Sequence, residues 1–196
     1  MDLQKKLVSL AETELSMWNK LTQNGNRFEG IPKGFEELRI SNAEELHAII
    51  KNQGWPGYSL AGKKGSEAAF RVARSSIDKP ELMKSFLTAI KNAVLKGEAS
   101  ETHGVILEDC ILNYQKKPQS CGVFFDWDEQ GEITVNVTDV ALANKKRKML
   151  GMPTIEEDMA KHKNEVAKEV GTKPQDIIDR QQQEDEWAKR VGWLPA

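Results

Sequence analysis

Asp109 and His103 are the residues whose chemistry and position most favour catalysis. Asp109 lies in an apolar stretch, where a carboxylate either faces solvent or is buried with a partner. His103 stands close to Glu101, Glu108 and Asp109, and an imidazole beside carboxylates can act as a general acid or base. An ordinary position in the first turn of a helix is the alternative for His103, and structural ion pairs resemble catalytic ones. Both are candidate catalytic residues.

The histidines and cysteines show no pattern of metal ligands. His47, His103 and His162 lie far apart, and none stands at ligand spacing from another histidine or from a cysteine. We therefore expect no metal, with His47 and His162 on solvated helix surfaces. Cys110 and Cys121 are too few for a disulfide framework, so we expect free thiols in a reducing compartment and leave any redox role open.

Residues 57–64 resemble the phosphate-binding loop G-x-x-x-x-G-K-[ST]. The last position is Lys64, which has no hydroxyl for Mg²⁺, and a Gly-Trp-Pro turn precedes the segment where a buried strand should stand. The segment therefore indicates a turn leading into a helix. We expect no nucleotide and no other cofactor.

Residues 145–148, Lys-Lys-Arg-Lys, form the one basic run of the chain. Such a run is either a patch for an acidic partner or, more commonly, a solvated helix face. The formal net charge of -2 gives no electrostatic reason to expect nucleic acid or an anionic membrane as a partner. The N-terminal residues lack the apolar segment of a signal peptide, and no stretch has the length of a membrane span, so we expect a cytoplasmic protein.

Helical periodicity dominates the elements that must position these residues. A loop is expected over 23–40, because it contains three glycines and a proline. Capping boxes at Ser41 and Thr154 each predict a helix start. The predicted helices cover residues 2–22, 41–53, 65–77, 80–96, 100–114, 138–150, 154–171 and 172–192.

The period changes to two over residues 119–137, where apolar and polar residues alternate on both sides of an Asp-Glu-Gln-Gly turn. This pattern predicts an antiparallel β-hairpin. The fold class is therefore α+β and predominantly α-helical, a helical body with one hairpin. A chain of 196 residues suits a single globular domain over 1–196.

The last predicted helix is polar throughout residues 181–186. We therefore expect it to contact the body only through Ile177, Ile178, Trp187 and Val191. Trp187 and Trp193 flank the C-terminus, where they either pack the tail onto the body or offer a surface to a partner.

The order of short motifs resembles that of an uncharacterised bacterial family of unknown function. The family pattern runs from an N-T pair through G-W-P, a glycine, H-A-D, D-R and Y-G-T-Q to an arginine pair ahead of G-L-P. The resemblance covers about residues 5–160 and leaves a C-terminal helical extension, about 161–196, outside it. Matching positions are Asn42, Gly54, Trp55, Pro56, Gly62, Pro80, Glu81, Asp109, Gln119, Gly122, Arg147, Gly151 and Pro153.

Several polar positions of the family pattern are replaced in this chain. The replacing residues are Ser75 and Ile77 in H-A-D, Met83 after it, Cys110 in D-R, and Cys121 and Phe124 in Y-G-T-Q. If the family's polar residues form a reactive pocket, this chain has lost its proton shuttle and its anion clamp. The resemblance therefore favours binding over catalysis.

Together these features predict a non-catalytic protein-interaction or regulatory protein of the bacterial cytoplasm. An immunity or antitoxin-type protein fits the size of the chain and its lack of metal or cofactor motifs. The alternative is a hydrolase or transferase that acts on a small polar substrate in a pocket around Asp109 and Arg147. The residues expected to bind are Asn42, Trp55, Gln119, Arg147, Trp187 and Trp193. The identity of the partner or substrate and the oligomeric state stay open.

Overall fold

The computed structural model describes residues 2–23, 33–168 and 177–195. The chain forms two compact units, Met1–Leu107 and Glu108–Ala196, and each is described by itself. Two such units can belong to one folded domain, so the single-domain organisation stays a prediction. Within the described ranges, none of the helices is both long and apolar enough to cross a membrane.

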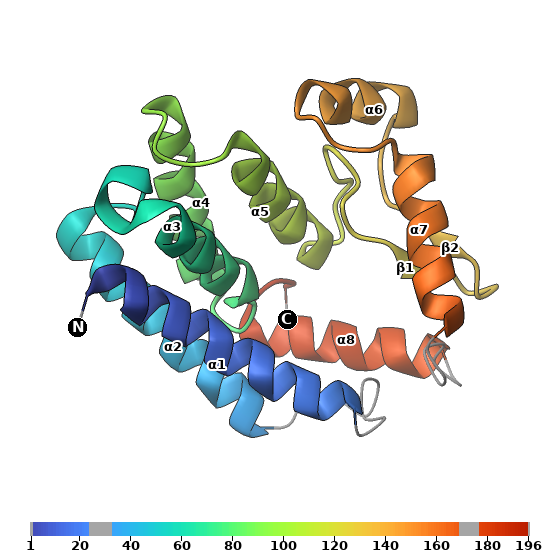
Figure 1. Ribbon diagram of the computed structural model, residues 1–196. Coiled ribbons are helices and arrows are strands. Elements are labelled where there is room, and N and C mark those ends of the chain that lie inside the picture. The colour runs from blue at the N-terminus through green and yellow to red at the C-terminus, as the bar shows by residue number, and fades with distance from the viewer. Residues whose placement is uncertain (1, 24–32, 169–176, 196) are drawn as a thin grey trace. The chain divides into compact units, whose positions relative to one another are not determined.

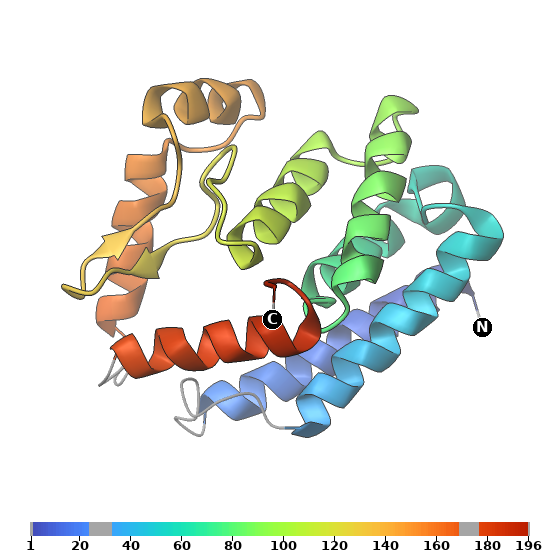
Figure 2. The ribbon, with the colours of Figure 1, turned by 180° about the vertical axis from the view of Figure 1, so that it is seen from behind.

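The first unit is built from α1 (Leu3–Gln23), α2 (Lys33–Gln53), α3 (Tyr58–Ser75), α4 (Pro80–Leu95) and the start of α5 (Glu101–Tyr114). Helix α1 packs on α2 and α3, and α4 packs on both α2 and α3 (Figure 1). Figure 2 shows the same helices from behind. Their shared core holds Leu7, Leu46, Val72, Met83, Phe86 and Ile90, all nearly inaccessible to solvent. The amphipathic periodicity of each helix supplies this core.

Helix α2 corrects the prediction of a loop over 23–40 with a helix start at Ser41. It begins at Lys33, so residues 33–40 are helical and Ser41 lies inside the helix, while residues 24–32 fall outside the described ranges. Phe35 and Leu46 are buried on its inner face, and the positions between them are filled by buried Arg39 and Asn42. Of the glycines and the proline that predicted a loop, only Gly34 lies within α2, and the buried Arg39 interrupts the apolar period of its first turns.

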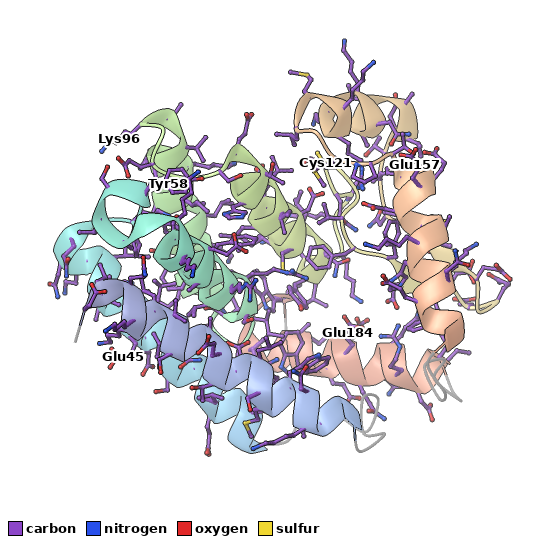
Figure 3. The ribbon with its side chains drawn as sticks, viewed as in Figure 1. Glu45, Tyr58, Lys96, Cys121, Glu157 and Glu184 are labelled. Carbon is purple, nitrogen blue, oxygen red and sulfur yellow. The ribbon has the colours of Figure 1, made fainter. Side chains whose placement is uncertain are left out.

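Helix α3 begins at Tyr58, several residues before the predicted start at 65. Glu98 caps it, because its carboxylate accepts the Ser59 N–H at 2.8 Å and its carbonyl accepts the Tyr58 N–H at 3.0 Å. Gly62 breaks the helical backbone with a φ of +67°, a conformation that glycine adopts freely. Residues 57–64 are thus a capped and kinked helix start rather than a phosphate-binding loop; Figure 3 labels Tyr58.

The second unit contains the rest of α5, β1 (Asp126–Trp127), β2 (Ile133–Thr134), α6 (Val140–Met149), α7 (Ile155–Lys168) and α8 (Ile177–Val191). The strands pair antiparallel, with Trp127 opposite Ile133. This confirms a predominantly helical α+β fold with one hairpin. The strands are shorter than 119–137 suggested, and residues 119 and 137 meet only in an isolated parallel bridge.

The capping box at Thr154 is confirmed. The Thr154 hydroxyl accepts the Glu157 N–H at 3.2 Å, and the Glu157 carboxylate accepts the Thr154 N–H at 2.8 Å. Helix α7 therefore starts where the sequence predicts. The predicted boundary between the last two helices, at residues 171 and 172, lies outside the described residues.

The polar stretch of α8 contacts the hairpin, contrary to the expectation that only apolar residues of this helix touch the body. Arg180 forms an ion pair with Asp126 and lies over the Trp127 ring, with its guanidinium carbon 5.6 Å from the ring centroid. The Gln181 side chain donates to the Trp127 carbonyl at 3.0 Å. Ile178, by contrast, is 64 % exposed. The hairpin offers charge and carbonyl groups, so polar residues form this contact.

Candidate functional site

The loop over residues 119–124 of the second unit is held by hydrogen bonds from side chains to its main chain; we call it the bracketed loop. The Gln119 side-chain amide closes it, donating to the Phe124 carbonyl at 2.9 Å and accepting the Phe124 N–H at 2.9 Å. Gly122 has a φ of +65°, and a Cβ there would lie 2.9 Å from a Val137 methyl carbon. Glycine is therefore required at this turn.

Asp109 reaches the bracketed loop from α5. Its side chain is fully buried, and its two carboxylate oxygens accept the N–H groups of Ser120 at 2.7 Å and Cys121 at 2.9 Å. Backbone N–H groups compensate a buried carboxylate in the way a cation would. Of the two alternatives for Asp109, exposure to solvent or burial with a partner, the structure shows burial, and the partner is the main chain.

Arg147 reaches the same loop from α6 and is also fully buried. Its Nη1 donates to the carbonyls of Cys121 at 2.9 Å and Gly122 at 3.0 Å, and its Nε donates to the Pro153 carbonyl at 2.5 Å. Its Nη2 forms an ion pair with Asp158 at the start of α7. Burial lowers the pKa of Arg147, against the opposing effect of nearby acidic groups. One guanidinium thus ties the loop, α6 and α7 together.

These contacts limit the chemistry that the bracketed loop can perform. Both oxygens of Asp109 and four donor directions of Arg147 are already engaged by the protein itself. Cys121, labelled in Figure 3, is 1 % exposed, and burial raises the pKa of its thiol, which disfavours a nucleophilic thiolate. Cys110 and Cys121 are both buried, and neither is part of a disulfide.

His103 belongs to the first unit, whereas Asp109 belongs to the second. Its ring stacks on Phe70 with centroids 4.0 Å apart, and its Nε2 lies 3.0 Å from a Glu67 carboxylate oxygen. Burial lowers the pKa of His103, and the negative charge of Glu67 acts in the opposite direction. An imidazole held by a carboxylate can exchange protons, so the catalytic role of His103 stays a prediction.

A buried polar cluster in the first unit was missed by the sequence analysis. It consists of Glu14, Arg39, Asn42, Ser75 and Asp78. Arg39 Nε donates to Asp78 Oδ2 at 2.7 Å, and its Nη2 lies 2.6 Å from the same oxygen with poor alignment for a hydrogen bond. Burial raises the pKa of Glu14, while hydrogen bonds from Ser75 and Asn42 and the charge of Arg39 act to lower it.

The signal for this cluster was present in the sequence. Leu7, Leu10 and Leu21 define the inner stripe of α1, and Glu14 stands at helical spacing within it. A carboxylate on an apolar stripe is the same feature that drew attention to Asp109. The cluster also includes Asn42 and Ser75, two positions at which the resemblance described in the sequence analysis led us to expect a match and a replacement.

The other residues expected to bind a partner or substrate mainly make packing contacts inside the protein. Asn42 donates to the Leu10 carbonyl at 3.2 Å. Trp55 is 9 % exposed, and no described residue accepts a hydrogen bond from its buried Nε1. Trp193 is 5 % exposed and stacks on Tyr114 with centroids 5.4 Å apart, while Trp187 meets the same ring edge-on at 5.5 Å. Their binding roles stay predictions.

The fold and the bracketed loop define a mostly helical protein whose buried polar residues hold main-chain segments in place. Among the residues that the structure describes, no group of three or more histidine, cysteine, aspartate or glutamate side chains could hold a metal ion. The chain belongs to a family of unknown function, DUF6624, whose model matches residues 1–170. No curated protein and no solved structure matches it. Helix α8 lies beyond the matched region.

Proposed function

We propose that this chain is a non-catalytic protein-interaction or regulatory protein. The observation that carries the proposal is the commitment of Asp109 and Arg147 to the backbone of the bracketed loop. Two buried charges that hold a loop in one conformation give the protein a fixed surface there, which a partner protein can recognise.

The same observation disfavours catalysis at this place. A substrate that took over either side chain would leave buried N–H or carbonyl groups without partners, which is strongly unfavourable. The resemblance described in the sequence analysis supports the same conclusion, because it implies a histidine and an arginine where this chain has Ser75 and Cys110. Neither can replace an imidazole as a proton shuttle or a guanidinium as an anion clamp.

The proposal includes a cellular setting and a type of partner. Two buried cysteines that form no disulfide suit the reducing bacterial cytoplasm. An immunity or antitoxin-type role, in which the chain binds and controls a second protein, fits a protein of this size. The alternative, a hydrolase or transferase with a small polar substrate, has no free group at Asp109 or Arg147 and would depend on His103 or on the buried polar cluster.

The test is capture of partners by the tagged full-length chain from a bacterial lysate that contains the native protein. Native mass spectrometry of the captured material then gives the stoichiometry of the complex and any retained ligand. A partner protein present in a fixed ratio after a high-salt wash is the expected result. A chain that carries a small polar ligand and no protein would contradict the proposal and favour the enzyme. A matched chain with Glu129→Gln, an exposed residue, controls for handling.

A further inference from the structure

Helix α6 is attached to the second unit through one face only. Ala143 is 2 % exposed and Arg147 is fully buried, and these two residues stand one turn apart. On the other side, Leu142 is 52 % exposed and Met149 is 81 % exposed. Figure 1 shows α6 lying across the start of α7. Large apolar side chains left in water on a firmly held helix indicate a surface for another molecule.

The exposed face of α6 is also basic. The helix contains three lysines and Arg147 but no acidic residue, and the charge of Arg147 is balanced by Asp158. Lys145, Lys146 and Lys148 are exposed. In the described part of the chain none of these three ammonium groups forms an ion pair. Three uncompensated positive charges therefore stand beside the exposed apolar residues.

The spacing of the apolar residues and lysines along α6 places them on one face of the helix. Leu142 and Met149 are seven residues apart, so they lie on one line of the helix, two turns or about 10 Å apart. Lys145 and Lys146 follow Leu142 by three and four residues and precede Met149 by four and three, so they lie between the apolar pair. We call Leu142, Lys145, Lys146 and Met149 the α6 surface.

We infer that the α6 surface docks an acidic amphipathic helix of a partner protein, an inference that rests on the proposed function. Such a helix places apolar side chains against Leu142 and Met149 and carboxylates against Lys145 and Lys146. The site is rigid before binding, because Arg147 fixes α6 from behind and the Asp139 side chain caps its start by accepting the Leu142 N–H at 2.9 Å. A preorganised surface loses little conformational freedom on binding.

Acidic groups beside α6 argue against a membrane or a nucleic acid as the occupant. Asn144 of α6 donates to the Glu156 carboxylate at 2.8 Å, and Glu157 caps the same end of α7; both glutamates are exposed. A continuous layer of phosphates would meet these carboxylates as well as the lysines and be repelled. The α6 surface also lacks the aromatic residues typical of helices that lie on a membrane. A protein helix can present acidic residues to the lysines alone.

The first experiment measures binding of a synthetic probe to the full-length chain. The probe is a helical peptide with leucines and glutamates on one face, and its twin carries glutamine in place of each glutamate. Vesicles of phosphatidylserine and phosphatidylcholine and a single-stranded RNA serve as competing probes. The variants are Lys145→Glu with Lys146→Glu, and Leu142→Glu with Met149→Glu. Leu95→Glu is the matched control, because Leu95 is 86 % exposed in the first unit.

We expect each double variant to weaken binding of the acidic peptide about 10-fold, and the glutamine twin to bind about 10-fold more weakly than its parent. Leu95→Glu should bind the peptide as the unaltered chain does. Equal binding of the two peptides would overturn the inference. So would an equal loss in Leu95→Glu, or a preference for vesicles or RNA that the double variants abolish.

A second measurement separates this inference from the proposed function. The double variants are used for capture in the lysate experiment described above. Loss of the captured partner, with circular dichroism unchanged, supports docking at the α6 surface. A partner that is retained by both double variants overturns the inference and leaves the proposed function standing. A failure of the unaltered chain to capture any protein contradicts the proposed function, and the peptide measurement still decides the chemistry of the surface.

Discussion

Asp109 and Arg147 both bind the main chain of Cys121, Asp109 at its N–H group and Arg147 at its carbonyl group. Asp109 Oδ2 accepts the Cys121 N–H at 2.9 Å, and Arg147 Nη1 donates to the Cys121 carbonyl at 2.9 Å. The two opposite charges therefore act on one another through the main chain of the bracketed loop. If either charge is removed, the loop loses the hydrogen bonds that this side chain makes to its main chain, and only those to the other side chain are left of this pair.

The first prediction concerns Asp109→Asn. An amide group has one oxygen acceptor, so the N–H of Ser120 or of Cys121 would face an NH₂ group and stay unpaired in a buried site. We expect a loss of about 2 kcal/mol in the free energy of unfolding, measured by urea unfolding. Glu129→Gln makes the same chemical change at an exposed position of the same unit and should have no measurable effect. Equal stability of the two variants would show that the loop does not depend on Asp109.

Arg147→Lys provides the second prediction. Lysine keeps the charge, but one ammonium group cannot reach Asp158 and the carbonyls of Cys121, Gly122 and Pro153 together. We expect a loss of about 3 kcal/mol in the free energy of unfolding, again from urea unfolding. Lys148→Arg, on the exposed side of the same helix, is the control and should change stability by less than about 0.5 kcal/mol. A lysine variant as stable as this control would contradict the role given to the guanidinium.

Most of the fold could be predicted from the sequence, because apolar periodicity marks the helices and alternation marks the hairpin. Prediction failed where polar residues occupy inward positions. Gly34 and the buried Arg39 made the first turns of α2 resemble a loop, and Arg180 and Gln181 made the side of α8 that contacts the hairpin resemble a solvated face. A polar residue that is buried with a partner cannot be told from an exposed one until the partner is known.

The candidate site shows the same limit. The burial of Asp109 could be predicted from its apolar neighbours, but its partners are N–H groups of a loop eleven and twelve residues further along the chain. Every residue has the same main-chain groups, so the sequence analysis could not identify the partner of Asp109. The cluster around Glu14 was missed for a related reason, since its members come from four separate segments of the first unit.

A pH dependence follows from Glu14. Burial raises the pKa of Glu14 above its ordinary 4.5, so the folded chain keeps this proton at pH values where the unfolded chain has released it. The folded state then binds more protons, and its stability falls as the pH rises from about 4.5 through the raised pKa. Glutamine cannot ionise, so Glu14→Gln should lack this fall. We expect the variant to gain stability relative to the unaltered chain as the pH rises towards neutral.

Urea unfolding at a series of pH values checks the Glu14 prediction. Glu12→Gln is the matched control, because Glu12 is exposed on the same helix and should leave the pH profile of stability unchanged. A constant difference in stability between Glu14→Gln and the unaltered chain across this range would rule out a raised pKa. A difference that moves in the opposite direction would mean that Arg39 and the hydrogen bonds outweigh burial.

His103 and Glu67 give a prediction about a single pKa. Burial lowers the pKa of His103 below 6.5, and both the charge and the hydrogen bond of Glu67 raise it. Glu67→Gln removes the charge, so the pKa of His103 should fall further. An NMR titration that follows the ring protons of His103 measures this shift of the pKa directly. Glu101→Gln, an exposed residue near the start of α5, should leave the pKa unchanged; a pKa that rises or stays the same in Glu67→Gln would contradict the pairing.

Trp193 lies beyond the region matched by the family, yet it is part of the core of the second unit. Its ring stacks on Tyr114, and it is 5 % exposed. Trp193→Ala should therefore lose about 3 kcal/mol in the free energy of unfolding, and Trp193→Phe should retain much of the stacking and lose less. Ile178→Ala is the control, because Ile178 is 64 % exposed on α8, the helix that precedes Trp193. Urea unfolding decides the matter: equal stabilities of Trp193→Ala and Ile178→Ala would mean that the C-terminal extension contributes no core. Partner-binding tests of Trp193 accordingly need the phenylalanine variant, because the alanine variant confounds binding with folding.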